Sequence, residues 1–258
     1  MQPLFCYPLI KGGKKVFKKK NDPIAVANHF IQQYYPHCQG AILAGSIVRG
    51  EGTSTSDLDI VIFDNSILSA FRESFYVEGW PVEVFIHNLS SYKHYFELDC
   101  ERAKPSLPKM IVEGMVLKDD GLLSSIQGEA RLLLSNGPKE WSKATITLKR
   151  YFLTDVLDDF IGSTTPEEDI FIVHTLLELA SEFVLRVNRQ WVGTSKWGYR
   201  ALKQFDESFA HKFIEVFDAY YKHRDKVKII ELVDEILEPF GGRLFEGFSL
   251  GKSTSNDH

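Results

Sequence analysis

The first regular pattern of apolar residues begins after Asp22 and Pro23. Apolar side chains then recur at helical spacing as far as Pro36, a residue that cannot continue a helix. An acid followed by proline is typical of a helix start, because the aspartate caps free backbone N–H groups and proline suits the first turn. The pattern therefore predicts a helix that ends before Pro36.

Short apolar segments follow this helix, separated by polar stretches that contain glycine. Residues 41–44 and 58–63 each predict a buried strand. Residues 81–87 (PVEVFIH) alternate with a period of two, which predicts a third strand. Its valines and its isoleucine share one face, so that Glu83 and Phe85 share the other.

The character of the sequence changes after about residue 90, where helical periods replace the strand patterns. We expect helices within residues 122–134, 141–160, 166–189 and, with breaks, 199–237. Strands followed by helices along one chain indicate an α+β fold. The predicted architecture is a mixed sheet with flanking helices, followed by a C-terminal helical bundle.

Prolines and a glycine between residues 103 and 120 interrupt the pattern between these two regions. We therefore predict a first domain over residues 1–105 and a helical domain over residues 106–250. Residues 251–258 are polar and are predicted to form a disordered tail.

The composition bears mainly on the cellular compartment of the protein and less on its fold. The 258 residues are 44% hydrophobic and 25% charged, as in packed globular proteins, and no apolar run has the about 20 residues of a membrane span. Three widely spaced cysteines form neither a disulfide framework nor a metal-ligand pattern, so we expect a cytoplasmic protein. The N-terminal lysines follow a short apolar stretch, the wrong order for a secretory signal, and are expected to be solvated (Lys14, Lys15, Lys18, Lys19 and Lys20).

The formal net charge of −5 does not favour nucleic acid as a partner, since proteins that bind nucleic acid usually carry a basic face. It permits a cationic small molecule. Residues 151–170 contain no basic residue and several acids, which suits a pocket for a polycation (Asp155, Asp158, Asp159, Glu167, Glu168 and Asp169). However, Glu167 and Glu168 follow Pro166, and the first turn of a helix favours acids in any case. The run therefore leaves the ligand open.

The most unusual feature is a pair of acids at the start of the second predicted strand. Asp57 and Asp59 are two positions apart, so their side chains point to the same side. Carboxylates held side by side repel each other and lose solvation, and a divalent cation is the simplest compensation. If the second and third strands pair, Glu83 joins them, and the three carboxylates suit Mg²⁺.

The segment before this pair has the features of a phosphate site. Gly45 lets the backbone approach a ligand closely, and Ser46 lies where a strand is expected to pass into a short helix. Arg49, one turn further on, can neutralise charge on a polyphosphate.

Together these residues resemble the motif of the nucleotidyltransferase superfamily. That motif is a Gly-Ser, here Gly45-Ser46, then an acid-x-acid pair at about this distance, then a third acid on a neighbouring strand. Ser56 and the Arg49-Gly50 dipeptide also match small bacterial members. The resemblance covers residues 41–87. The helical remainder is more loosely similar to nucleotidyltransferases that modify antibiotics.

The resemblance implies that Asp57, Asp59 and Glu83 hold two Mg²⁺ ions. A nucleoside triphosphate, with ATP favoured, would place its phosphates at the preceding segment (Gly45, Ser46, Arg49 and Ser56). An acceptor hydroxyl on a small molecule would attack the α-phosphorus, and pyrophosphate would leave. Glu83 could instead be the base that takes the proton of the acceptor, because the third acid plays either part within the family.

The helical region offers weaker candidates. Lys196 lies in a glycine-containing loop that looks like one that brings a lysine to the nucleotide phosphates in several small nucleotidyltransferases. His174, Glu178 and Glu182 recur every four residues, so they form either a cleft-facing group or a solvated helix face. The resemblance also leaves a homodimer open, since antibiotic-modifying relatives often pair.

The sequence also leaves other functions open. One is a transferase that modifies a protein, as in toxin–antitoxin pairs, although such subunits are usually shorter than this chain. Another is a regulatory protein that binds nucleotides without turnover, although the acids are intact here. A polynucleotide polymerase is disfavoured by the negative net charge.

Overall fold

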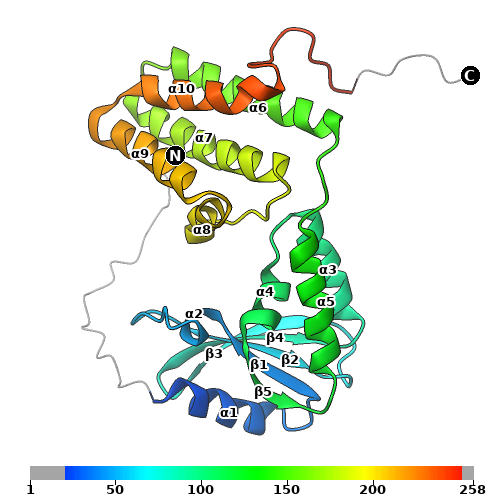
Figure 1. The fold of residues 1–258 in the computed structure, drawn as a ribbon. Coiled ribbons are helices and arrows are strands. Elements are labelled where there is room, and N and C mark those ends of the chain that lie inside the picture. Colours follow the sequence, from blue (N-terminus) through cyan, green and yellow to red (C-terminus); the bar gives the residue numbers. More distant parts are fainter. Residues whose placement is uncertain (1–20, 252–258) are drawn as a thin grey trace, which may run out of the picture. The chain divides into compact units, whose positions relative to one another are not determined.

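The computed structural model describes residues 21–251 (Figure 1). The N-terminal lysines and the predicted tail beyond Gly251 lie outside the described residues. The expectations for these segments therefore stay predictions.

A five-stranded mixed sheet organises the first part of the fold, with the strand order β3-β4-β2-β1-β5. Strands β2 and β4 run parallel, and every other neighbouring pair is antiparallel. The strands are β1 (Gly40–Ala44), β2 (Leu58–Phe63), β3 (Phe71–Val77), β4 (Trp80–His87) and β5 (Met115–Asp119).

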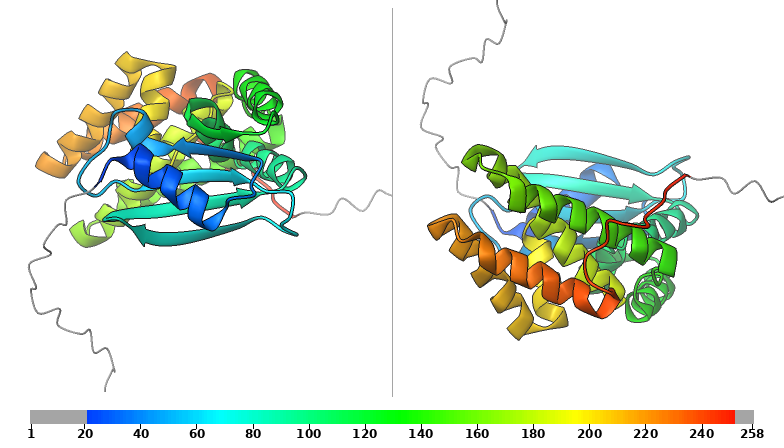
Figure 2. Two further views of the ribbon diagram at one scale, coloured as in Figure 1. Left: turned by 90° about the horizontal axis from the view of Figure 1, so that it is seen from below. Right: turned by 90° about the horizontal axis from the view of Figure 1, so that it is seen from above.

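Helix α1 (Pro23–Tyr34) covers one face of this sheet (Figure 2). Its start is the one that the sequence predicts, because the carboxylate of Asp22 accepts a hydrogen bond from the N–H of Ala25 at 2.8 Å. Phe30 and its buried neighbours on α1 pack against the apolar side chains of β2 and β4. Since side chains alternate along a strand, the acids of these two strands point to the opposite face.

Strands β3 and β5 were not predicted from the sequence. Both are edge strands, and β3 is mostly exposed, with polar residues at consecutive positions that hide its alternation. A tight turn at Glu78 and Gly79 joins β3 to β4. Both residues have positive φ, 48° and 86°, which is typical of a type I′ hairpin turn.

Helices make up most of the remaining chain, and a second apolar core lies among those from α6 onward. Within residues 21–251 none of the helices is long and apolar enough to cross a membrane. The mixed sheet with its flanking helices and the later helical region confirm the α+β class. The helices are α3 (Ser91–Glu101), α4 (Ser106–Glu113), α5 (Leu123–Asn136), α6 (Lys143–Gly162), α7 (Pro166–Val187), α8 (Lys196–Phe205), α9 (Glu207–His223) and α10 (Lys226–Leu237).

The chain divides into two compact units, each made from two segments. Of the described residues, the first unit contains residues 21–93 together with Lys109–Glu129, and thus the whole sheet. The second unit combines His94–Pro108 with residues 130–251. The domain ranges 1–105 and 106–250 stay a prediction. The chain passes from one unit to the other within α3, α4 and α5.

Candidate metal and phosphate site

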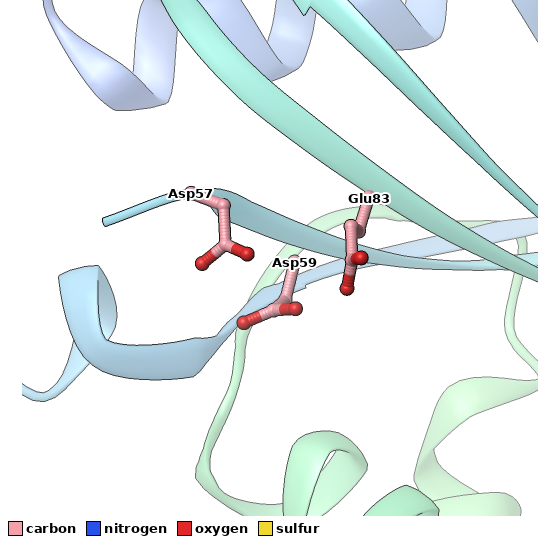
Figure 3. Close-up of side chains that lie close together, drawn as sticks. All are labelled: Asp57, Asp59 and Glu83. Carbon is pink, nitrogen blue, oxygen red and sulfur yellow. The ribbon is translucent and has the colours of Figure 1, made fainter. Parts of the chain in front are cut away.

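Three carboxylates gather on the face of the sheet opposite α1. Asp57 directly precedes β2, Asp59 is its second residue, and Glu83 lies on β4. The parallel register pairs Asp59 with Glu83, which brings the two strands' acids side by side. One oxygen from each of the three carboxylates lies within 4.8 Å of the others (Figure 3). The cluster therefore has the oxygen ligands that a hard divalent cation such as Mg²⁺ prefers.

The carboxyl group of Asp59 in this cluster has a clearly shifted pKa. Burial, followed by the negative charges of Asp57 and Glu83, raises the pKa of Asp59 from 3.8 to about 6. The guanidinium groups of Arg49 and Arg72 oppose this rise of the pKa. A bound divalent cation would remove the repulsion, so the residues present fit a metal ion.

Gly45 lies directly against this cluster, at the junction of β1 and α2 (Gly45–Val48). Its φ is +82°, which disfavours any residue with a side chain. A Cβ atom here would lie 2.1 Å from Oδ2 of Asp59. The backbone can therefore pass beside the carboxylate only because this residue is glycine. Since α2 is a single turn, we attribute no helix-dipole effect to it.

Hydrogen bonds organise the loop between α2 and β2. The hydroxyl of Ser46 donates to Oγ of Ser56 at 3.1 Å. Oγ of Ser56 also accepts the backbone N–H of Thr53 at 2.8 Å. The two serines that the motif singles out thus lie together, and they place hydroxyl groups next to the acidic pair.

Arg49 ends α2 and is held by two acids. Its Nε lies 3.2 Å from a carboxylate oxygen of Glu51, and its Nη1 lies 3.3 Å from one of Glu113 on α4. The side chain of Arg49 is 23% exposed. Arg49 could exchange its ion pairs with these two acids for contacts with the phosphates of a ligand.

Two further cations were missed from the sequence, one paired with Glu83 and one whose charge interacts with that of Arg49. Arg72, on β3, is ion-paired with Glu83. Lys109, on α4, has a lowered pKa because burial disfavours its charge, with Glu113 raising the pKa and Arg49 lowering it further. The turn at Gly79 before β4 was a signal for a hairpin and thus for β3 and Arg72, although the consecutive polar residues of β3 hide its alternation. No local signal distinguishes Lys109 from a surface lysine.

The other predicted residues lie in the second unit. Lys196 is the first residue of α8, and its phosphate-binding role stays a prediction. His174 is 3.8 Å from Glu178, and Glu182 accepts a hydrogen bond from Lys149 at 2.7 Å. These contacts are those of an exposed or half-exposed helix face.

The acids of residues 151–170 lie in different surroundings. Asp169 is buried and structural, since the hydroxyl of Tyr220 and the ammonium of Lys226 both donate to its carboxylate. Other acids of the run line an open cavity of about 670 Å³ beside Phe171 (Asp158, Asp159 and Glu168). Asp158 at this cavity already lies 3.6 Å from Nη1 of Arg243, and a polycation there stays a prediction.

Comparison with known proteins gives distant likenesses only. No model of a protein family matches the chain, and no curated protein matches it. Ten chains of solved structures match, among them a nucleotidyltransferase-like protein from Exiguobacterium sibiricum. That protein shares 11% sequence identity with a TM-score of 0.46, over 84% of this chain and 75% of its own. A likeness this distant carries no argument about activity.

Proposed function

We propose that the protein is a nucleotidyltransferase that transfers a nucleoside monophosphate, with AMP from ATP favoured, to a hydroxyl of a small molecule. The observation that carries this proposal is the convergence of Asp57, Asp59 and Glu83 beside Gly45. A structural acid pair would not need a third acid from a neighbouring strand, or a glycine pressed against one carboxylate.

In this proposal each group has a defined task. Asp57, Asp59 and Glu83 hold Mg²⁺, which supplies charge neutralisation for the phosphates during in-line attack on the α-phosphorus. Ser46 and Ser56 offer hydroxyl groups to the phosphates, and Arg49 neutralises the outgoing pyrophosphate. A base takes the proton of the acceptor hydroxyl as the new P–O bond forms and the bond to pyrophosphate breaks.

The test is nucleotide binding by calorimetry, with non-hydrolysable analogues of ATP, GTP, CTP and UTP, each with and without Mg²⁺. We expect the wild-type protein to bind one of them, the ATP analogue, only with Mg²⁺. The double variant Asp57→Asn/Asp59→Asn should lose this binding, because each change removes a metal ligand at nearly constant volume.

The matched control is Asp120→Asn, which removes one exposed acid just after β5. It should bind the nucleotide as the wild type does. Absence of Mg²⁺-dependent binding for all four nucleotides, or unchanged binding in the double variant, would contradict the proposal.

A further inference from the structure

The register of the β3–β4 hairpin brings an arginine to the carboxylate cluster. Arg72 is paired with Phe85, and Ser74 is paired with Glu83. Because side chains two positions apart share a face, Arg72 is the diagonal neighbour of Glu83 on the acidic face of the sheet. A long side chain can reach its diagonal neighbour. A shift of the register by one residue would place Arg72 and Glu83 on opposite faces and abolish this contact.

Two contacts hold the guanidinium group in this place. Its Nη2 donates to Oε1 of Glu83, and its Cζ lies 4.9 Å from the centre of the Phe85 ring. The side chain of Arg72 is 58% exposed, whereas that of Glu83 is 25% exposed. The guanidinium group of Arg72 therefore stacks on the Phe85 ring at the β3 edge of the sheet and contacts the carboxylate of Glu83.

This pair opposes a movement that the cluster would otherwise make. Asp57 and Asp59 repel Glu83, and a free glutamate side chain would turn away from them. Arg72 occupies one oxygen of Glu83 and leaves the second for a cation. Partners that hydrogen-bond a metal ligand in this way orient it and raise the affinity of the site.

We propose that Arg72 is a positioning residue that holds Glu83 as a ligand of the divalent cation. This inference rests on the proposed function. It also assigns Glu83 to the metal rather than to the acceptor proton, because a carboxylate shared between a guanidinium and a metal ion has little basicity left. The base of the reaction is then another group.

Two effects of opposite sign determine how much Arg72 contributes to cation binding. Its positive charge repels the incoming cation, but the exposed position and salt screen that repulsion. Loss of orientation of a ligand typically costs about tenfold to a hundredfold in metal affinity. With the repulsion subtracted, we expect Arg72→Met to weaken cation binding about threefold to tenfold.

The experiment uses the full chain and Mn²⁺ as the probe. Free Mn²⁺ is measured by electron paramagnetic resonance, with and without a saturating non-hydrolysable ATP analogue. Glu83→Gln should weaken Mn²⁺ binding at least about tenfold, as expected for a ligand. Adding Arg72→Met to Glu83→Gln should change the affinity by less than about twofold, since Arg72 acts through Glu83.

Two variants and one control separate position from charge. Phe85→Leu removes the aromatic shelf and keeps every charge, and it should weaken binding in the same direction as Arg72→Met. Arg72→Lys should restore part of the loss. Lys118→Met removes one positive charge on β5, at the other edge of the sheet, and should leave the affinity unchanged. Thermal melting of each variant verifies the fold.

Several outcomes would overturn the inference. Arg72→Met could leave Mn²⁺ binding unchanged or make it tighter, or it could act equally in the Glu83→Gln background. Wild-type affinity in Glu83→Gln would return the glutamate to the role of base. If the wild type binds both Mn²⁺ and nucleotide while Arg72→Met does not change the Mn²⁺ affinity, the inference about Arg72 fails and the proposed function stands. If the wild type binds no Mn²⁺ under either condition, the proposed function fails with it.

Discussion

Two titratable groups of the sheet, half-buried Asp59 and buried His87, respond to pH in opposite directions. Burial and the neighbouring carboxylates raise the pKa of Asp59 to about 6, and burial lowers the pKa of His87 from 6.5 to about 4. Between pH 3.8 and about 6 the folded protein binds more protons at Asp59 than the unfolded chain does. Its stability therefore falls as the pH rises through this range. At His87 the folded protein binds fewer protons between pH 4 and 6.5, so stability rises with pH there.

These two contributions oppose each other in the metal-free protein, and Asp59→Asn removes one of them. We expect the free energy of unfolding of this variant at pH 7 to exceed that of the wild type by up to about 3 kcal/mol. This figure is the shift of the Asp59 pKa from 3.8 to about 6, at about 1.36 kcal/mol for each pKa unit. The effect of His87 should then emerge as a rise of stability with pH. Urea denaturation between pH 4 and 7, in the presence of a chelator, measures both.

Addition of Mg²⁺ provides the control for this measurement. It should stabilise the wild type at pH 7 and have little effect on Asp59→Asn, because the variant lacks one of the ligands. Parallel stability curves for the two proteins between pH 4 and 7 would contradict the assignment of this titration to Asp59.

The junction between β1 and α2 shows how one element constrains another. Gly45 has a positive φ and lies against Oδ2 of Asp59, the second residue of β2. Gly50, just beyond the same short helix, also has a positive φ, 71°, but a Cβ there would meet nothing within 4 Å. The two glycines therefore share the backbone requirement and differ in what they adjoin.

This difference gives a matched pair of substitutions. Gly45→Ala and Gly50→Ala should each cost about 1 kcal/mol of stability through the positive φ. Gly45→Ala should in addition displace the carboxylate of Asp59 and weaken Mn²⁺ binding at least about tenfold. Gly50→Ala should bind Mn²⁺ as the wild type does. Equal Mn²⁺ affinity in the two variants would mean that the close approach at Gly45 does not matter for the cation.

At the scale of the whole molecule, the sheet unit contains the carboxylates and their cations, and the helical unit contains Lys196. Lys196 begins α8, and Lys203, on the same helix, lies 2.9 Å from Glu207. The resemblance of its loop to one in small nucleotidyltransferases predicts that Lys196 contacts the phosphates of the nucleotide. Lys203 already has an acidic partner and serves as the control for a lysine on this helix.

We expect Lys196→Ala to raise the dissociation constant for the ATP analogue about threefold to tenfold, by loss of one exposed phosphate contact. Its melting temperature should not change, because the side chain is exposed. Lys203→Ala should leave nucleotide binding unchanged. If calorimetry gives the same dissociation constant for both variants and the wild type, Lys196 is an ordinary solvated lysine.

The local pattern of the sequence predicted a large part of the fold. The cap at Asp22 and the apolar periods gave α1, β1, β2, β4 and the long helices, because each depends on residues close together in the chain. Edge strand β3 escaped because its exposed positions do not need to be apolar. Helix α3, and helix α4 in the segment of the prolines, were not predicted either.

What the sequence by itself determined is the face of its strand on which each acid lies. The spacing of Asp57 and Asp59 places both on one face of a strand, and the period of β4 places Glu83 on a single face, without reference to the rest of the molecule. The tertiary structure decided that Arg72 meets Glu83, through the register of the β3–β4 hairpin, and that Arg49 pairs with Glu113 on α4. The physical reason is that strand order and register follow from the burial of whole faces, which sums over distant segments, whereas periodicity is a property of neighbouring residues.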